Sequence, residues 1–279
     1  MKMNQHLIAL DLDGTLLTDN KVISEKTKKV VMQAKQAGHI VVIATGRPHR
    51  ASIDYYKELE LDTPMVNFNG ALIHHPLDKK WDAVHSPLPN RTAKAIVQSC
   101  YDLEVNNIMA EVGDDVYLDR YDEELMKIFH TDQANPVTVG SLKNNLQNDP
   151  TSLLIHPQEE HIQELRSHLD DKHASVIEHR KWGAPWHVIE IVRKGLNKAV
   201  GLEKIARYFD IPQSHIIAFG DEDNDLEMIE YAGVGVAMGN GIEELKKLAN
   251  HVAETNEADG IGGFLEEYLH LGVQSTSTK

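Results

Sequence analysis

Two carboxylates, those of Asp11 and Asp13, stand one residue apart directly after the apolar run Leu7–Leu10. The run predicts a β-strand, and Gly14 allows the chain to turn sharply just beyond the pair. Like charges this close together are costly unless a cation or a proton separates them. The pair therefore suits a carboxylate nucleophile beside a general acid/base, with Mg²⁺ suppressing their repulsion.

A solvated turn is the plain alternative for this motif, because Asp-Gly pairs are common in turns that have no chemical role. A calcium-binding EF-hand loop is excluded. Such a loop starting at Asp11 needs Gly at its sixth position and Glu at its twelfth, and the chain has Leu16 and Val22 there. Groups further along the chain decide between a turn and a catalytic site.

Two later apolar runs also end in groups that could do chemistry. The run His39–Ala44 leads into Thr45–Arg47, and His215–Phe219 leads into the acidic stretch Gly220–Asp225. Between them, Lys198 opens a stretch whose apolar residues have helical spacing. Ligands of doubly wound α/β sheets bind outside the carboxyl ends of the strands, so we expect the carboxylates, the hydroxyl and the ammonium to lie together.

The order of these motifs resembles that of a known family. D-L-D-G-T-L, T-G-R, a lone lysine and G-D-x-x-N-D are similar, in sequence and in spacing, to the motifs of the haloacid dehalogenase (HAD) superfamily. Four more runs are similar to those of its Cof-type phosphatases: Asn67–Ala71, Asn197–Lys198, Ala237–Asn240 and Asp259–Ile261. The resemblance covers nearly the whole chain.

The resemblance implies a role for each polar group. Asp11 would be the nucleophile and form an aspartyl-phosphate, and Asp13 would protonate the leaving oxygen and then activate water. The implied Mg²⁺ ligands are Asp11, Asp13 through its backbone carbonyl, and Asp221, with Asp225 supporting them. The residues that would bind phosphate or substrate are Leu12, Thr45, Gly46, Arg47, Lys198 and Asn224.

These groups are the ones that phosphoryl transfer needs. The transition state spreads negative charge over its equatorial oxygens, and an ammonium, a hydroxyl, backbone amides and a metal ion all stabilise that charge. Oxygen ligands of this kind favour Mg²⁺. Glu222 departs from the family pattern, which has a small or neutral residue there. It either strengthens metal binding or points into solvent, and we favour solvent.

The composition is that of a soluble globular protein: of 279 residues, 41% are hydrophobic and 25% charged. The net charge of −15 speaks against nucleic-acid binding, which needs a surplus of Lys and Arg. Cys100 is the only cysteine, which rules out an internal disulfide and fits a reducing compartment. Met1–His6 lacks the apolar stretch of a signal peptide, and no run approaches the ~18 apolar residues of a membrane helix. We therefore expect a cytoplasmic protein with no membrane partner and no obligate protein partner.

We predict an α/β fold, a doubly wound Rossmann-like parallel sheet core with an inserted α+β cap domain. Residues 1–82 and 189–279 would form the HAD-like core, 83–188 the cap, and 273–279 a disordered tail. The helices expected in the core are 24–36, 49–59, 197–209, 225–232, 242–249 and 264–269, and its later strands are 64–68, 71–74, 215–220, 234–238 and 251–254. Ser24 as N-cap and Gly38 beyond the end delimit the first of these helices.

Within the insert, helices at about 90–102 and 158–170 alternate with short β-type runs. The family implies that this cap closes over the catalytic face, excludes water and selects the leaving group. Its segment Arg180–Trp186 contains two cations and two indoles, which could form a substrate rim. We favour the alternative, a solvated turn whose Trp side chains pack on the core of the cap.

Three classes of function remain. The leading one is a Mg²⁺-dependent phosphatase of small phosphorylated metabolites, such as sugar phosphates, nucleotides or phosphorylated cofactors. The second is a phosphotransferase or phosphomutase that uses the same aspartyl-phosphate, and dependence on a bisphosphate activator would indicate it. The third, a catalytically idle binding protein, is disfavoured because the set of groups is complete: Asp11, Asp13, Thr45, Lys198 and Asp221.

Overall fold

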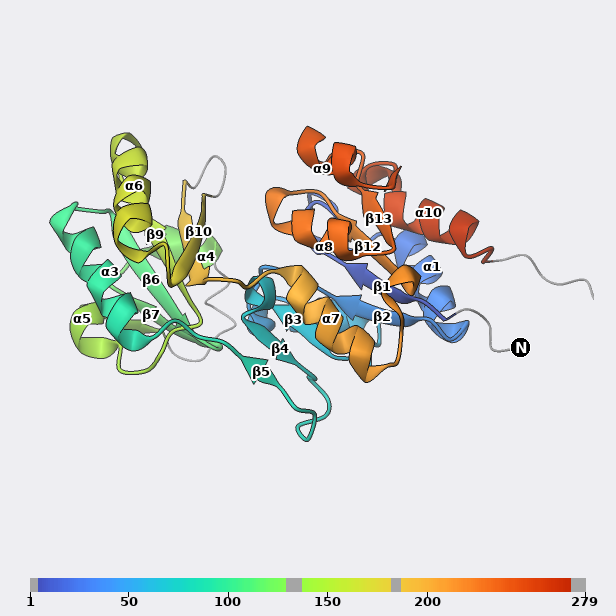
Figure 1. Cartoon of the computed structure of the whole chain (residues 1–279), viewed down its shortest axis with the longest axis horizontal. Helices are drawn as coiled ribbons and strands as arrows, with labels where there is room; N and C mark the ends of the chain where they lie inside the picture. The colour runs from blue at the N-terminus through green and yellow to red at the C-terminus, as the bar shows by residue number, and fades with distance from the viewer. Residues whose placement is uncertain (1–4, 129–136, 182–186, 272–279) are drawn as a thin grey trace, which may run out of the picture. The chain divides into compact units, whose positions relative to one another are not determined.

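The computed structural model describes residues 5–128, 137–181 and 187–271 of the chain (Figure 1). The chain divides into two compact units. Residues 1–46, 53–82 and 197–279 belong to the first unit, and residues 47–52 and 83–196 belong to the second. The second unit thus includes the segment 47–52, which the sequence places in the core, and extends beyond residue 188, where the sequence ends the insert.

The first unit contains a five-stranded parallel sheet in the order β14-β13-β12-β1-β2. Its strands are β1 (Leu7–Leu10), β2 (Ile40–Ile43), β12 (Ile216–Gly220), β13 (Val234–Ala237) and β14 (His251–Val252). The first strand of the chain lies inside the sheet, so later strands are added on both sides of it. This is the doubly wound topology that the sequence predicts, and the α/β fold is confirmed.

Helices cover both faces of this sheet (Figure 1). They are α1 (Glu25–Gln36), α7 (Lys198–Tyr208), α8 (Leu226–Tyr231), α9 (Glu243–Leu248) and α10 (Gly260–Tyr268). α1 and α10 pack together and share a core with alternate strand residues such as Leu10 and Phe219. α8 packs on the opposite face, where a Cβ on Gly235 would meet Ile229, and α7 and α9 lie beside it. Because both faces are covered, the inner strands β1, β12 and β13 are buried along their whole length.

The predicted limits of the first helix are confirmed. Its N-cap Ser24 accepts a hydrogen bond from the backbone N–H of Thr27 (3.1 Å), and Gly38 follows the helix with a φ of +94°. The last helix begins at Gly260, earlier than predicted. It starts directly after Asp259, whose φ of +60° ends the preceding 3₁₀ turn, η7 (Asn256–Ala258).

The prediction of one helix over 49–59 is wrong. The chain forms a 3₁₀ turn, η1 (His49–Ala51), followed by a short α2 (Ile53–Glu58). Ser52 interrupts the helix with a φ of −125°, and its hydroxyl donates hydrogen bonds to the carbonyls of Pro48 (2.9 Å) and His49 (3.1 Å). A serine that bonds to the backbone in this way competes with helix formation.

The predicted strands 64–68 and 71–74 form a hairpin. β3 (Met65–Asn67) and β4 (Leu72–His74) are antiparallel. The turn between them is a 3₁₀ element, η2 (Phe68–Gly70), whose residues all have positive φ. The backbone N–H of Asn69 donates to the carbonyl of Thr45 (3.2 Å), so this turn lies at the carboxyl end of β2.

The second unit contains a six-stranded sheet in the order β10-β11-β9-β6-β7-β8, in which β7 and β8 are parallel and the other neighbours antiparallel. Its strands are β6 (Asn107–Val112), β7 (Asp115–Leu118), β8 (Thr138–Val139), β9 (Ser152–His156), β10 (Ile177–Lys181) and β11 (Ile189–Arg193), and β5 (Val84–His85) precedes them. Its helices are α3 (Asn90–Asp102), α4 (Glu123–Ile128), α5 (Leu142–Asn145) and α6 (Ile162–His173). α3 and α6 cover one face, in a core that contains Ile108, Ile155 and the buried Cys100.

Strand β10 is an element that the sequence did not predict. Its last two residues, Arg180 and Lys181, pair with β11 instead of lying in a turn. The strand contains few apolar residues, so the alternation of apolar and polar residues that indicates a strand is weak in the sequence. The rest of that segment, Trp182–Trp186, lies outside the described residues, and so does the predicted tail 273–279.

A buried ion pair explains why the segment 47–52 belongs to the second unit. Arg50 donates to Oε1 of Glu111 on β6, and both side chains are buried. The hydroxyl of Ser152 donates to the other oxygen of Glu111 (2.7 Å), and the backbone N–H of Arg50 donates to Asp114 (2.9 Å). Buried charges are stable only when they are paired, so this network fixes the segment to the sheet.

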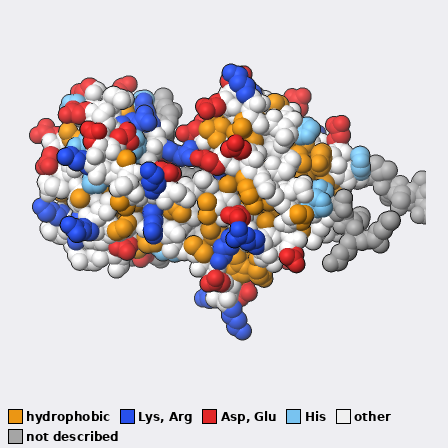
Figure 2. Space-filling model, in the orientation of Figure 1, with side chains coloured by type: hydrophobic (Ala, Val, Ile, Leu, Met, Phe, Trp, Pro, Cys, Tyr) orange, Lys and Arg blue, Asp and Glu red, His pale blue; other side chains and the backbone are white. Residues whose placement is uncertain are grey.

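The surface carries charges of both signs. On the face drawn in Figure 2, acidic and basic side chains of the described residues are interspersed. This agrees with a composition that holds 43 acidic residues against 28 Lys and Arg. No helix in the described part of the chain is both long enough and apolar enough to cross a bilayer.

Candidate active site

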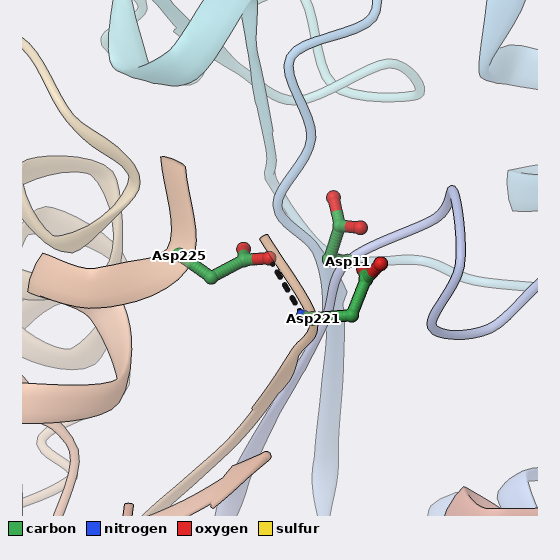
Figure 3. Close-up of side chains that lie close together, drawn as sticks. All are labelled: Asp11, Asp221 and Asp225. Atoms are coloured by element: carbon green, nitrogen blue, oxygen red, sulfur yellow. Dashed lines mark hydrogen bonds between the residues drawn. The ribbon is translucent and has the colours of Figure 1, made fainter. Parts of the chain in front are cut away.

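Three carboxylates converge at the carboxyl end of the parallel sheet of the first unit (Figure 3). Asp11 follows β1, Asp221 follows β12, and Asp225 ends the 3₁₀ turn η6 (Asp223–Asp225) that opens α8. The backbone N–H of Asp11 donates to the carbonyl of Phe219 (3.2 Å), which continues the pairing of the two central strands up to the site. One oxygen of each carboxylate lies within 4.8 Å of the others, and all three residues are buried.

Lys198 places an ammonium between two of these carboxylates. It is the first residue of α7, whose N-cap Asn197 accepts a hydrogen bond from the N–H of Val200 (3.1 Å). Its Nζ lies 2.6 Å from Oδ1 of Asp11 and 2.7 Å from Oδ1 of Asp225, and the residue is fully buried. Burial by itself lowers the pKa of a lysine, but the two carboxylates outweigh it and raise the pKa of Lys198. The lysine is therefore charged in this site.

Burial makes two of the carboxylates hold protons more tightly than usual. It is the largest cause that raises the pKa of Asp11 well above its ordinary range; Lys198 opposes it, and the charges of Asp225 and Asp221 add to it. Burial also raises the pKa of Asp221 to about 7, although the hydroxyl of Thr15 donates to its Oδ1 (2.7 Å). One ammonium does not balance three buried carboxylates, so the site favours a further cation.

Asp225 is fixed through its second oxygen. Oδ2 accepts hydrogen bonds from the backbone N–H groups of Asp221 (3.0 Å, dashed in Figure 3) and Glu222 (3.2 Å). The side chain of Glu222 accepts from the N–H of Asp225 in return, which makes a capping box over the turn. Glu222 is exposed, and it supports the turn that carries Asp225.

The donor set fits a hard divalent cation. Across the described ranges, Asp11, Asp221 and Asp225 are the one group of three or more His, Cys, Asp or Glu side chains close enough to share an ion. Carboxylate oxygens are the ligands that Mg²⁺ prefers. The carboxylate of Asp13 stands apart from this group: its Oδ1 lies 2.7 Å from Nζ of Lys21, and the side chain is 43% exposed. The side chain of Asp13 is thus accessible to water.

Asn69 lies in the run Asn67–Ala71, to which the sequence analysis assigned no role, and it contacts two residues that were predicted for the site. Its backbone N–H donates to the carbonyl of Thr45, and its Oδ1 accepts a hydrogen bond from the side chain of Asn224 (3.0 Å). A Cβ on Gly46 would lie 3.1 Å from this side chain, so Asn69 packs closely against the Thr45 loop. The Asn-Gly pair signals the turn, whose φ of +51° Asn tolerates, but it does not signal the contact with Asn224.

Thr15 is a second residue that sequence reasoning missed. It is buried, and its hydroxyl donates to Asp221, so it fixes the orientation of a carboxylate from the neighbouring strand. A signal was present, because Thr15 belongs to the first motif. Its partner became visible only once the fold had brought the ends of β1 and β12 together.

Leu12 and Arg47 are placed differently from the other predicted ligands. The side chain of Leu12 is fully buried in the core of the first unit, so its backbone is the part available to a phosphate. Arg47 belongs to the second unit, where its NH1 donates to the carbonyl of Ala51 (3.2 Å). Among the predicted phosphate- and substrate-binding residues, Arg47 is the one that the first unit does not contain.

Known proteins are similar to this chain over nearly its whole length. The family model of the haloacid dehalogenase-like hydrolases matches residues 8–265. The 5-amino-6-(5-phospho-D-ribitylamino)uracil phosphatase YitU of Bacillus subtilis is 54% identical, over 97% of this chain and 100% of its own. The pyridoxal phosphate phosphatase YbhA of Escherichia coli is 30% identical, over 96% of this chain and 100% of its own.

Solved structures have the same fold. TM0651 from Thermotoga maritima superposes with a TM-score of 0.82 at 28% identity, covering 94% of this chain and 97% of that one. Hydrolases of this family generally use a metal ion, which agrees with the buried aspartate cluster. With a family match that begins in β1 and ends in α10, the chain belongs to the haloacid dehalogenase-like hydrolases and is a phosphatase.

Proposed function

We propose that this phosphatase hydrolyses small phosphorylated metabolites with Mg²⁺, through an aspartyl-phosphate on Asp11. The observation that carries the proposal is the contrast between two carboxylates of one motif. Asp11 is buried and held by Lys198, whereas Asp13 is partly exposed. A buried and positioned carboxylate suits a nucleophile, and an accessible one suits proton transfer.

The two carboxylates would act in two steps. In the first, an oxygen of Asp11 bonds to phosphorus while the bond from phosphorus to the leaving oxygen breaks, and Asp13 gives its proton to that oxygen. In the second, Asp13 takes a proton from water, the water oxygen bonds to phosphorus, and the bond to Asp11 breaks. Inorganic phosphate leaves, and both carboxylates are back in their first state.

Asp11, Asp221 and Asp225 would hold the Mg²⁺, together with the backbone carbonyl of Asp13. The ion supplies positive charge that offsets the buried carboxylates and the phosphate oxygens. Lys198 keeps its ammonium beside Asp11.

The remaining phosphate oxygens need donors that are already in place. Charge that develops on them in the transition state is stabilised by a hydroxyl, an ammonium and amides that do not have to reorient. We assign this work to Leu12 through its backbone, Thr45, Gly46, Arg47, Lys198 and Asn224. The insert, residues 83–188, would act as the cap that excludes water and contacts the rest of the substrate.

The relative that is 54% identical gives the first substrate to try. Its name states that it acts on 5-amino-6-(5-phospho-D-ribitylamino)uracil, a phosphorylated sugar alcohol joined to a pyrimidine. A second relative, 30% identical, is named for pyridoxal phosphate. We therefore propose a phosphate ester on a small heterocyclic metabolite as the substrate class, with the ribitylaminouracil phosphate as the leading member.

A phosphate-release assay tests this function. The protein with Mg²⁺ is offered the ribitylaminouracil phosphate, pyridoxal phosphate, sugar phosphates and nucleotides, and Asp11→Asn serves as the blank. We expect the fastest release from the ribitylaminouracil phosphate and none above background from the variant. Phosphate release that persists in Asp11→Asn would contradict the assignment of Asp11 as the nucleophile. A requirement for a bisphosphate activator would identify a phosphomutase instead.

A further inference from the structure

Two asparagines from the last part of the first unit hold the loop that carries Asp13. Nδ2 of Asn240 donates to the carbonyl of Gly14 (2.8 Å), and Oδ1 of the same amide accepts from the backbone N–H of Asn256 (3.0 Å). Nδ2 of Asn256 in turn donates to the carbonyl of Leu17 (3.0 Å). Asn240 and Asn256 thus form one continuous link, named here the asparagine clasp.

The partners of the clasp fix the direction of each hydrogen bond. The carbonyls of Gly14 and Leu17 can only accept, and the backbone N–H of Asn256 can only donate. Turning the amide of Asn240 over would set donor against donor at one end and acceptor against acceptor at the other. An aspartate at this position could still accept from Asn256, but it has no N–H to offer to Gly14.

The two asparagines differ in burial. Asn256 is 9% exposed and sits in η7, where its Nδ2 also reaches Oδ1 of Asp19 (3.3 Å). The next residue, Glu257, accepts a hydrogen bond from the backbone N–H of Asp19 (2.6 Å). Asn240 is exposed and lies in the turn after β13. It therefore contacts the catalytic loop without being part of the core, and its loss should cost little stability.

The segment around Asn240 contacts both of the loops that carry the site. Besides the bond from Asn240 to Gly14, the backbone N–H of Ile242 donates to the carbonyl of Asp221 (2.9 Å). Gly14 itself is packed against the carboxylate of Asp221. The clasp thus acts on the residue that follows Asp13, at the point where the two strand-end loops meet.

We infer that Asn240 is a positioning residue for the general acid/base: it holds the Gly14 carbonyl, and thereby fixes the backbone from which the Asp13 carboxylate reaches the leaving oxygen. This inference rests on the proposed function of Asp13. A proton from Asp13 matters most when the leaving group is a poor one, so loss of the clasp should slow alkyl phosphates more than aryl phosphates. An asparagine that only stabilises the fold would affect both alike.

The chain offers a matched control for this test. Asn250 is also exposed, and its Oδ1 accepts one backbone hydrogen bond, from Gly235 (2.7 Å), away from the catalytic loop. Asn240→Asp and Asn240→Ala are compared with Asn250→Asp and Asn250→Ala. The Ala variants separate the loss of the hydrogen bond from the effect of an added negative charge.

Two substrates give the first readout: the best alkyl phosphate found in the screen, and p-nitrophenyl phosphate, whose leaving group needs no proton. Both Asn240 variants should lower kcat about 10- to 100-fold on the alkyl phosphate, with much less effect on p-nitrophenyl phosphate. KM and the thermal midpoint should stay near their wild-type values. The Asn250 variants should leave KM and the kcat on both substrates unchanged.

Amide hydrogen exchange gives a second readout that does not depend on activity. Peptides that cover residues 12–19 should exchange faster in the Asn240 variants than in the Asn250 variants. Unchanged exchange there, or equal losses of kcat on both substrates, would overturn the positioning role. If Asp13→Asn keeps the wild-type kcat on the alkyl phosphate, the proposed function of Asp13 fails and the role of Asn240 falls with it, whatever the exchange data show.

Discussion

Gly14 lies so close to Asp221 that a Cβ at residue 14 would fall 2.1 Å from Oδ2 of that carboxylate. Residue 14 also has a φ of +70°, which L side chains rarely adopt. Glycine is therefore needed for two independent reasons, one of backbone conformation and one of space. The close approach packs the loop after β1 directly on the carboxylate that follows β12.

We expect Gly14→Ala to lower the free energy of unfolding by about 3 kcal/mol or more, since it adds a clash to the conformational cost. It should also weaken Mg²⁺ binding, because Asp221 must move. Gly113→Ala is the control: its φ is +59° and a Cβ there would meet nothing within 4 Å, so it should cost about 1 kcal/mol. Urea unfolding measures the free energy of unfolding of both variants. Equal losses in the two variants would mean that the contact with Asp221 is relieved at no cost.

Lys198 offers a second test, because it is fully buried between two carboxylates. Lys198→Met keeps most of the volume and removes the charge, which leaves Asp11 and Asp225 without their partner. We expect the free energy of unfolding to fall by about 3–5 kcal/mol, and the double variant Lys198→Met/Asp225→Asn to lose less. Thermal and urea unfolding without metal measure this. A single variant as stable as the wild type would show that the carboxylates are already neutral.

The parts of the site that follow from local sequence were predictable. Asp11 and Asp221 each come directly after a continuous apolar run, and parallel strands end at one edge of the sheet, so their meeting follows from two strand assignments. Lys198 starts a helix whose cap, Asn197, is visible in the sequence. Each of these conclusions needs one residue and the element that carries it.

The contacts between distant side chains were not predictable. Two contacts join segments that are far apart in the chain: Asn69 with Asn224, and Asn240 with Gly14. The spacing of residues within one segment does not specify its partner in the other. The same holds for Arg50, whose pairing with Glu111 places the segment 47–52 in the second unit. Pattern reasoning reports which face of an element is apolar; it does not report which polar atoms meet after folding.

The reaction should depend on a cation that suits the carboxylate oxygens of Asp11, Asp221 and Asp225. EDTA should abolish turnover, Mg²⁺ should restore it, and Ca²⁺ should not. Calcium takes more ligands at longer distances than magnesium and would engage both oxygens of Asp11, which would remove the one that attacks phosphorus. Phosphate release with each ion added back measures this. Full activity in excess EDTA would contradict the cation site.

Stability should also depend on pH through three histidines whose pKa values are lowered in the folded chain. Burial is the main cause that lowers the pKa values of His39, His85 and His173 below the 6.5 of an exposed histidine. The unfolded chain therefore binds more protons than the folded one as the pH falls below about 6.5, and the free energy of unfolding decreases there. Above that pH, both states carry neutral histidines and this contribution is constant.

His39→Asn isolates one of these groups. The Nδ1 of His39 accepts a hydrogen bond from the backbone N–H of His6 (3.1 Å), and an Asn oxygen can accept it without titrating. The variant should lose less stability than the wild type between about pH 7 and pH 5. Urea unfolding at several pH values measures this difference. If the free energy of unfolding changes with pH equally in His39→Asn and in the wild type, the prediction is contradicted.

The lone cysteine has a practical consequence. Cys100 lies inside the core of the second unit, and burial raises the pKa of its thiol, so the reactive thiolate is scarce. The native chain should therefore be nearly inert to maleimides and other thiol-directed dyes. A cysteine introduced on the surface of each unit would react with the dye while Cys100 stays unlabelled. Energy transfer between the two dyes would then report the separation of the units in solution as Mg²⁺ and substrate are added.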